Sequence, residues 1–423
     1  MQRLNADSLD LKSIVRPGDT VIWGQACAEP LTLTEALVAQ RAELGGISVF
    51  LGSSFSNTLQ PEYANDIRFR GIGAMGTHRR LTKAGVLDVL PCHVSKMESY
   101  IADGILPCDV AFVQVAPQDE AGNFSLGLAS DYIRAATRRA RVVVAEMNLR
   151  VPQVPCAELL TTSDIDFLVE SDRSLLELAP APVSDLDRTI AGFVQSYVPD
   201  RATLQVGIGA VPQAVMSDLR DRRGLGIHSG MIGDSVVDLV ESGAVTNAHK
   251  EVDPGIIVTG ALIGTRRLYD FCDRNEGVRM YPLSHTHNLA TLSRLSRFVS
   301  LNSAVEVDLT GQVNAEVAKG HYIGGVGGQV DYVRAAAASP GGRSIIGLPS
   351  TAQNGAVSRI VLQLSGPVTT ARSDVDVIVT EYGAAELRGK TLSQRAKALI
   401  AIAHPAHRES LDRAAHFLAK DTV

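Results

Sequence analysis

Aromatic residues are scarce in this chain, and cysteines are few. Aromatic side chains make up 5% of the 423 residues, with a single tryptophan, whereas glycine occurs 37 times. This composition is typical of α/β proteins, in which glycine-rich turns join strands to helices, and it disfavours an aromatic-rich β protein. The five cysteines are scattered and include no Cys-x-x-Cys pair, which predicts reduced thiols in a cytoplasmic protein rather than disulfides or a zinc site.

The chain also lacks basic runs and long apolar runs. Its formal net charge is -6, which disfavours electrostatic binding to nucleic acid or to anionic lipid. The sequence starts with the polar stretch MQRLNADSLDLKSIV and has no apolar run of about 18 residues, so we expect neither a leader peptide nor a membrane-spanning helix. These absences predict a cytoplasmic protein whose partner is a small molecule, with no nucleic acid and no membrane.

Metal and nucleotide signatures are missing as well. Pro405 interrupts His404-x-x-His407, and His285-x-His287 has no third ligand near it in the sequence. No Walker A or dinucleotide-binding glycine pattern follows a predicted strand. We therefore predict no metal site, no nucleotide hydrolysis and no hydride transfer.

The length and one weak repeat predict two domains. Single cores stop growing near about 250 to 300 residues, which is shorter than this chain. A strand at Thr20 to Trp23, a glycine turn and a helix opened by Pro30 form a β-turn-α unit, and Ala202 to Leu219 repeats that order. The segment from Pro180 to Arg188 resembles a linker. We predict similarly built domains at residues 1–185 and 186–423.

Several apolar runs in the first half predict buried strands of a largely parallel sheet. These runs are Ile47 to Leu51, Asp109 to Val115 and Ala140 to Glu146, and helical stretches separate them. Ligands of such sheets bind at the carboxyl ends of the strands. The loops Ala116 to Gly127 and Glu146 to Pro152 are therefore the first places to look for a site.

Glycine-rich turns mark the second half. Leu204 to Pro212 reads LQVGIGAVP, and Gly324 to Asp331 reads GGVGGQVD; both can present backbone N–H groups to a ligand because glycine has no Cβ. The run Gly226 to Asn247 reads GIHSGMIGDSVVDLVESGAVTN, in which Asp234 is expected to cap a helix at 235–241. The stretch 300–314 alternates apolar and polar residues, which predicts a strand pair that turns at Thr310-Gly311.

These motifs together resemble the acetyl-CoA hydrolase/transferase family, which are class I CoA-transferases of the 4-hydroxybutyrate and butyrate:acetate kind. The resemblance extends from about Val15 to Leu411 and includes the loops APQDEAGNFSLG and EMNLRVP of the first half. It implies two α/β domains with mainly parallel sheets and an active site in the cleft between them. It also implies a coenzyme A thioester as substrate, no covalently bound cofactor, and a homodimer or larger homo-oligomer.

The family's nucleophile is missing. The family pattern reads G-I-H-[ST]-E-M-[IF]-[ST]-D-G, and this chain has Gly230 where the glutamate is expected. In the family mechanism that carboxylate attacks the thioester, becomes a glutamyl thioester and passes CoA to a new carboxylate, none of which glycine can do. The groups that could compensate are His228 and Ser229 beside the gap, Glu306, or a carboxylate of the first half such as Glu29, Asp119 or Glu120.

The resemblance also implies which residues bind the substrate. Arg359 and Arg388 are possible partners of CoA phosphates, although each is as well explained by a structural ion pair. The residues expected to polarise the thioester or to bind CoA are Gly207, Ile208, Gly209, Gly325, Val326, Gly327, Gly328, Ser350 and Arg359.

Three functions follow from this reading. The first is an acyl-CoA hydrolase that cleaves either a thioester or a C–C bond, in which water is activated where the glutamate would stand. The second is a CoA-transferase that uses a substitute carboxylate. The third is a CoA-ester binding protein without catalysis. The sequence favours the hydrolase, because the glycine loops of the family are in place and only the nucleophile is absent.

Overall fold

The computed structural model describes residues 1–421 and divides into two compact units. Unit 1 comprises Met1–Ala179, Ser229–Asp234 and Ile256–Asn288, and unit 2 comprises Pro180–His228, Ser235–Gly255 and the chain from Leu289 onward. The division into domains 1–185 and 186–423 stays a prediction. The compact units differ from it because two later segments pack with the first part of the chain.

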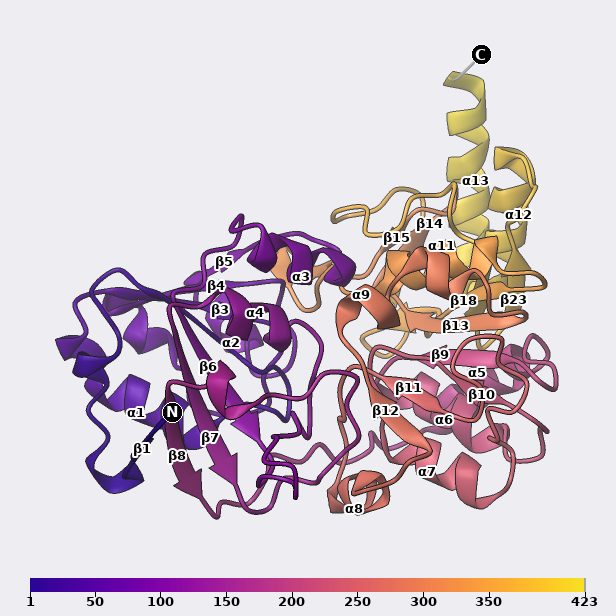
Figure 1. Cartoon of the computed structure of the whole chain (residues 1–423). Helices are drawn as coiled ribbons and strands as arrows, with labels where there is room; N and C mark the ends of the chain where they lie inside the picture. Colours follow the sequence, from indigo (N-terminus) through magenta and orange to yellow (C-terminus); the bar gives the residue numbers. More distant parts are fainter. Residues whose placement is uncertain (422–423) are drawn as a thin grey trace. The chain divides into compact units, whose positions relative to one another are not determined.

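Unit 1 is built on an eight-stranded sheet whose strand pairs are all parallel (Figure 1). Its spatial order is β1-β8-β7-β6-β2-β3-β4-β5. The strands are β1 (Gln2–Leu4), β2 (Thr20–Trp23), β3 (Ile47–Leu51), β4 (Ile67–Gly71), β5 (Leu87–Val89), β6 (Val110–Val115), β7 (Val142–Asn148) and β8 (Phe167–Ser171). The largely parallel sheet is therefore confirmed, and the predicted strands at 20–23 and 47–51 have these bounds in the structure.

Both faces of this sheet are buried. Val21 packs in one apolar cluster with Leu33 and Leu37, whereas its neighbour Ile22 packs in the other cluster with Met97 and Ile101. Successive strand residues point to opposite faces, so a strand covered on both faces must be apolar throughout. The helices of unit 1 are α1 (Leu31–Gln40), α2 (Arg79–Lys83), α3 (Val94–Ala102), α4 (Ile133–Arg139), α8 (Arg266–Cys272) and α9 (Leu283–Thr286), and a small parallel pair is formed by β11 (Ile257–Thr259) and β12 (Val278–Met280).

The strand order of unit 1 reverses between β2 and β6. From β2 the chain moves outward through β3, β4 and β5, and it then returns to β6 and continues outward on the other side through β7 and β8. In parallel α/β sheets a crevice for ligands forms at the carboxyl ends of the strands where the order reverses. The loops after β2 and β6 therefore flank the candidate position for a site in unit 1.

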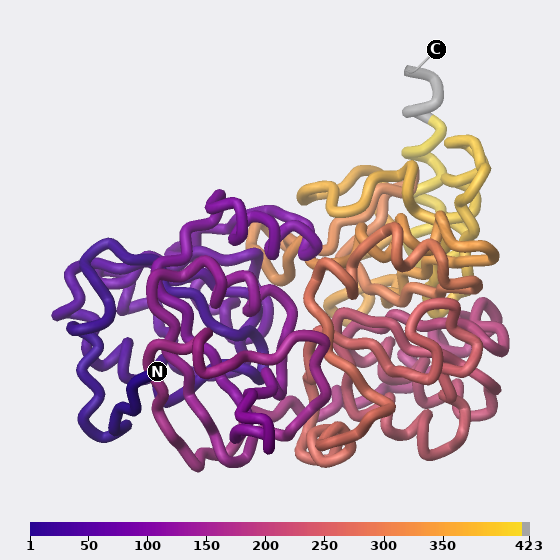
Figure 2. The backbone as a smooth tube through the Cα atoms, in the orientation of Figure 1, coloured from indigo at the N-terminus to yellow at the C-terminus, as the bar shows by residue number. Residues whose placement is uncertain are grey.

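Unit 2 has a six-stranded sheet of order β10-β9-β13-β18-β22-β23, parallel except for the last pair. Figure 2 shows β9 beside β13 although about ninety residues separate them in the chain, and their ladder pairs Leu204 with Val299. The strands are β9 (Thr203–Val206), β10 (Gly226–Ile227), β13 (Phe298–Ser303), β18 (Arg343–Gly347), β22 (Val377–Thr380) and β23 (Gly383–Glu386).

Helices and short strands complete unit 2. The helices are α5 (Asp185–Gln195), α6 (Ala210–Asp218), α7 (Asp234–Glu241), whose first residue belongs to unit 1, α10 (Leu289–Leu292), α11 (Gln329–Ala338), α12 (Leu392–Ile402) and α13 (Pro405–Asp421). The short strands are β14 (Glu306–Asp308), β15 (Val313–Asn314), β16 (Val317–Ala318), β17 (His321–Tyr322), β19 (Thr351–Ala352), β20 (Val357–Ser358) and β21 (Ile360–Val361). No helix of residues 1–421 has the length and apolar character needed to cross a membrane.

Three local predictions differ from the structure. The predicted linker ends earlier, because Ser184 and Asp187 form a capping box that starts α5 at Asp185. The strand pair of 300–314 is shorter, because 300–303 belongs to β13 and only β14 and β15 pair across the turn. Asp234 lies in the first turn of its helix, and its carboxylate accepts hydrogen bonds from Thr265 N (3.0 Å) and Oγ1 (2.7 Å) at the start of α8.

Two glycines of unit 1 allow a matched test of how its loops pack. Gly76 and Gly85 both have positive φ, 65° and 72°, but a Cβ at Gly76 would overlap the carbonyl oxygen of Ser54, whereas a Cβ at Gly85 would meet nothing within 4 Å. We expect Gly85→Ala to cost about 1–2 kcal/mol of unfolding free energy from backbone strain alone. Gly76→Ala should cost at least about 3 kcal/mol because the loop after β3 must also move. Chemical denaturation of both variants checks this, and equal losses would contradict it.

Candidate functional site

The carboxyl ends of the unit 2 strands carry most of the predicted site residues. After β9 the chain turns through Gly207, Ile208 and Gly209 into α6. Gly207 N donates to Leu301 O (3.3 Å), and Gly209 has a φ of 130°, a value that favours glycine. Within residues 1–421 no acceptor is found for the backbone N–H of Ile208 or Gly209. These groups lie at a helix start, where they suit a partly negative oxygen.

Ser350 and Arg359 lie together beyond the end of β18. Ser350 is fully buried and donates from N (2.8 Å) and Oγ (2.6 Å) to the carboxylate of Glu381, which follows β22. The backbone N–H of Arg359 donates to Ser350 O (2.8 Å). Burial lowers the pKa of Arg359, and the nearby Glu381 carboxylate opposes that shift. The structure thus brings two predicted binding residues into contact and adds Glu381 to them.

Glu306 is fully engaged in hydrogen bonds. Its carboxylate accepts from Asn314 Nδ2 (3.0 Å), from Ser365 N (2.7 Å) and from Ser365 Oγ (2.9 and 3.1 Å), and the residue is 8% exposed. Four such contacts leave little freedom for a nucleophile, so this geometry favours a structural role.

Arg388, a possible partner of CoA phosphates, donates to Asp376 Oδ2 (3.0 Å). It therefore has the structural ion pair that the sequence left open as an alternative.

The glycine loop precedes α11. Gly325, Val326, Gly327 and Gly328 are half-buried, and Gly327 has a φ of 61°. The loop leaves β17 through Ile323, whose N–H donates to Glu316 O (2.8 Å). Its backbone N–H groups thus stand at the start of a ten-residue helix, the arrangement that the sequence predicted.

The run with the missing glutamate passes from one unit to the other. His228 closes β10 in unit 2, where its N–H donates to Leu204 O (3.0 Å), and Ser229 begins the next segment of unit 1. Ser229 N donates to Val258 O (3.0 Å), and Gly230 O accepts from Gly260 N (3.2 Å). Gly230 therefore lies alongside the extension of β11, with its carbonyl group held in place.

A hydrogen-bonded pair that sequence reasoning missed, the buried Asp131 and the half-buried Gln25, lies close to this segment. Gly260 O accepts from Ser130 N (2.9 Å), so the backbone of Gly230 is two hydrogen bonds away from the Ser130-Asp131 segment. The Asp131 carboxylate accepts from Gln25 Nε2 and from Tyr132 N, and burial raises its pKa to about 6. Gln25 follows β2 and Asp131 precedes α4 after β6, so the pair joins the two loops where the strand order reverses. The only signal for this pair in the sequence was the general expectation that ligands bind at loops after the carboxyl ends of parallel strands.

The first-half carboxylates considered as substitutes differ in their surroundings. Glu29 is buried and accepts from Ser54 Oγ (2.8 Å) and Thr34 Oγ1 (3.0 Å). Asp119 is exposed and accepts from Asn123 N (2.8 Å) in a turn of its own loop, and Glu120 beside it is exposed. None of these hydrogen bonds links Glu29, Asp119 or Glu120 to Gly230.

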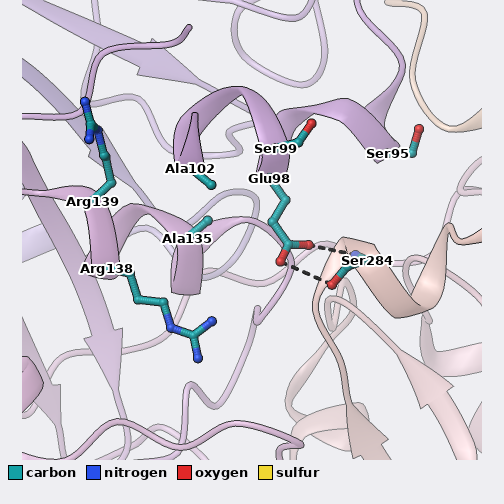
Figure 3. A pocket seen from close by; sticks show the side chains of 8 residues that line it. All are labelled: Ser95, Glu98, Ser99, Ala102, Ala135, Arg138, Arg139 and Ser284. Atoms are coloured by element: carbon teal, nitrogen blue, oxygen red, sulfur yellow. Dashed lines mark hydrogen bonds between the residues drawn. The ribbon is translucent and has the colours of Figure 1, made fainter. Parts of the chain in front are cut away.

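A separate pocket of about 410 Å³ in unit 1 contains none of the predicted residues (Figure 3). It lies between α3, α4 and the start of α9, and Glu98 projects toward Ser284. The Glu98 carboxylate accepts from Ser284 N (2.7 Å) and Oγ (3.2 Å), and Arg138 at the edge pairs with Glu158 (2.8 Å). Since the Glu98 carboxylate and the Arg138 guanidinium already have partners and the pocket contains no predicted site residue, we place the candidate site at the strand ends.

The raised pKa of Asp131 gives a pH prediction. The folded state holds a proton near pH 5 that the unfolded state, with a carboxyl pKa of 3.8, has lost, so stability should fall as pH rises from about 4 to 6. Asp131→Asn does not titrate, and its stability relative to the parent should rise over this window by up to about 1.4 kcal/mol per pH unit. Denaturation at several pH values measures the difference. Asp119→Asn, which removes an exposed carboxylate, is the control, and a constant gap for Asp131→Asn would contradict the prediction.

Comparisons with known proteins cover nearly the whole chain. Residues 5–180 match the acetyl-CoA hydrolase/transferase N-terminal domain, and residues 264–415 match the C-terminal domain of the same name.

The chain is 41% identical to the 4-hydroxybutyrate coenzyme A transferase of Clostridium kluyveri over 399 residues, which is 92% of each chain. The crystal structure of RipA from Yersinia pestis superposes with a TM-score of 0.93 at 32% identity and covers 99% of this chain and 98% of that one. The 4-hydroxybutyrate CoA-transferase of Porphyromonas gingivalis gives a TM-score of 0.84 at 34% identity over 98% of this chain and 97% of that one. The sequence resemblance is thereby confirmed, and the chain belongs to the acetyl-CoA hydrolase/transferase family.

Proposed function

We propose that this protein hydrolyses an acyl-CoA, with water attacking where the family's glutamate would attack. The observation that carries the proposal is Gly230 itself, which supplies no side chain for a glutamyl thioester. The surroundings of the other carboxylates described above support it. Glu306 and Glu381 are held by hydrogen bonds to serine and asparagine groups, and Glu29 is held by Ser54 and Thr34.

The chemistry needs a polarised carbonyl and an activated water. The N–H groups of Ile208 and Gly209 are suited to stabilise the oxygen of the tetrahedral intermediate, as an oxyanion hole does. Water adds to the thioester carbon, the C–S bond breaks, and the products are a carboxylic acid and the thiol of CoA. His228 and Ser229 are the candidate groups to orient or deprotonate that water. Water can attack an internal carbonyl of a cyclic β-keto acyl group in the same way. The C–C bond then breaks, the departing carbon takes up a proton, and the ring-opened acyl-CoA gains the mass of one water.

Binding of the CoA moiety is assigned to the remaining strand-end residues. The Gly325–Gly328 loop presents backbone N–H groups, and Arg359 is a half-buried cation beside Ser350. We place the anionic part of the substrate on these groups. The cytoplasmic location and the homodimer or larger homo-oligomer implied by the resemblance form part of this proposal.

Incubation with acyl-CoAs distinguishes the three functions. Purified protein is mixed with short-chain and bulky cyclic acyl-CoAs, with and without acetate, and CoA species are separated by chromatography with mass detection. We expect free CoA, or an acyl-CoA whose mass has increased by one water, independent of acetate. Acetyl-CoA formed only when acetate is present would contradict hydrolysis and indicate transfer. No turnover of any acyl-CoA that still binds would indicate a binding protein.

Restoring the carboxylate tests the assignment of Gly230. We expect Gly230→Glu to gain acetate-dependent CoA transfer and to form a glutamyl-CoA adduct that mass spectrometry detects, because the family's nucleophile is restored. Gly230→Gln is the matched control, since it has nearly the same shape and no nucleophilic oxygen anion. Equal activity of the two variants would contradict the assignment of position 230.

A further inference from the structure

The strand that leads to His228 is an edge strand of the unit 2 sheet. β10 pairs only with β9, through Gly226 N to Ala202 O (2.9 Å) and His228 N to Leu204 O (3.0 Å). In a parallel ladder the N–H and C=O of the residue between such donors point away from the partner strand. The N–H and C=O of Ile227 therefore face the other side, where no further strand pairs with β10 but the segment 244–247 lies beside Leu225. Leu225 N donates to Ala244 O (2.8 Å), and Thr246 N donates to Leu225 O (3.0 Å).

Two buried side chains from this segment and from the residues just after it continue its contacts beside Ile227. Ile227 N donates to Asn247 Oδ1 (2.8 Å), and Lys250 Nζ donates to Ile227 O (2.9 Å). Asn247 and Lys250 are each only 4% exposed. The peptide between Ile227 and His228 is thus held at both ends, because Lys250 binds its C=O and Leu204 O accepts from its N–H.

The surrounding residues are adapted to this arrangement. A Cβ at Gly226 would lie 2.7 Å from Lys250 Cγ, so the lysine stem crosses the strand where only glycine leaves room. Asn247 has a φ of 57°, a conformation that asparagine tolerates better than most residues. Burial lowers the pKa of Lys250 to about 7, with Asp253 opposing the shift, so the amine is kept inside at a cost to its charged form. A solvent-exposed strand edge would need none of these features.

We infer that Asn247 and Lys250 are positioning residues that fix the two peptide groups on either side of Ile227. They thereby fix the direction in which the backbone continues into His228 and the segment that contains Gly230. The inference rests on the proposed function, because it treats His228 and its neighbours as the place where the acyl-CoA reacts. The two side chains touch no reacting atom. Their contribution is to prevent rotation of the peptide immediately before His228, and small displacements of reacting groups are costly to rate.

Position 247 offers a matched pair of variants. Asn247→Gly keeps the left-handed backbone and removes the acceptor, whereas Asn247→Asp keeps both the backbone preference and an acceptor oxygen. Lys250→Met removes the donor and retains an apolar stem. We expect Asn247→Gly and Lys250→Met to lower kcat for acyl-CoA turnover by about tenfold or more while KM changes less than about threefold. Asn247→Asp should retain most of the parent kcat.

Ser339→Ala is the structural control. Ser339 is buried and holds the opposite end of the same sheet, where its Oγ accepts from Phe298 N (3.1 Å) at the start of β13 and donates to Leu295 O. This variant loses a comparable contact to a strand and should leave kcat close to the parent value. If Ser339→Ala and Asn247→Gly reduce kcat equally, or if Asn247→Asp falls as far as Asn247→Gly, the positioning role is overturned.

A second measurement does not depend on turnover. Histidine-selective ¹³C NMR follows the ring of His228, assigned by its loss in His228→Gln, in the parent and in each variant. We expect Asn247→Gly and Lys250→Met to shift or broaden this signal and Ser339→Ala to leave it unchanged. An unchanged His228 signal in both site variants would overturn the inference even if the parent is active. A parent without acyl-CoA turnover would refute the proposed function alone, and the NMR result would then decide the positioning role.

Discussion

The parallel hydrogen-bond ladder of unit 2 determines where its functional groups can lie. Because β10, β9, β13, β18 and β22 all run in one direction, their carboxyl ends share one edge of the sheet. His228, Gly207, Ser350 and Glu381 follow four of these strands, and they reach the same edge although more than a hundred residues separate the first pair from the second. The site is thus a product of strand direction, and each loop only has to supply one or two groups.

Burial of carboxylates decides which acids are available for chemistry. Glu306, Glu381 and Glu29 each accept at least two hydrogen bonds from side chains or backbone, which hold the carboxylate in place and restrict its motion. Burial raises the pKa of Asp131 despite the hydrogen bonds that its carboxylate accepts from Gln25 and Tyr132. A scaffold that has glycine at position 230 therefore contains acids, but most of them serve to hold loops together.

The sequence predicted the parts of the fold that depend on local pattern. The apolar runs at 20–23 and 47–51 are strands because both of their faces are covered, and the turn at 207–209 lies between a strand and a helix as its glycines indicated. What could not be predicted are contacts between distant residues. Gln25 and Asp131 are 106 positions apart, and neither has a local signal that names the other. Likewise, the asparagine and lysine that bind Ile227 lie 20 and 23 residues after it, in a stretch that contains other polar residues equally suited by type.

Unit 1 is made of segments that are synthesised at different times, because part of unit 2 lies between them in the sequence. Unit 1 needs Ser229–Asp234 and Ile256–Asn288 as well as its first 179 residues, and unit 2 begins at Pro180. On the ribosome the first sheet can form early, yet the segment that pairs β11 with β12 and holds Gly230 emerges roughly a hundred residues later, about 5 to 20 seconds at typical synthesis rates. During that interval the carboxyl ends of the first sheet lack their final cover. A chain cut at any single peptide bond between Pro180 and Gly255 would therefore separate Ile256–Asn288 from the first 179 residues of unit 1.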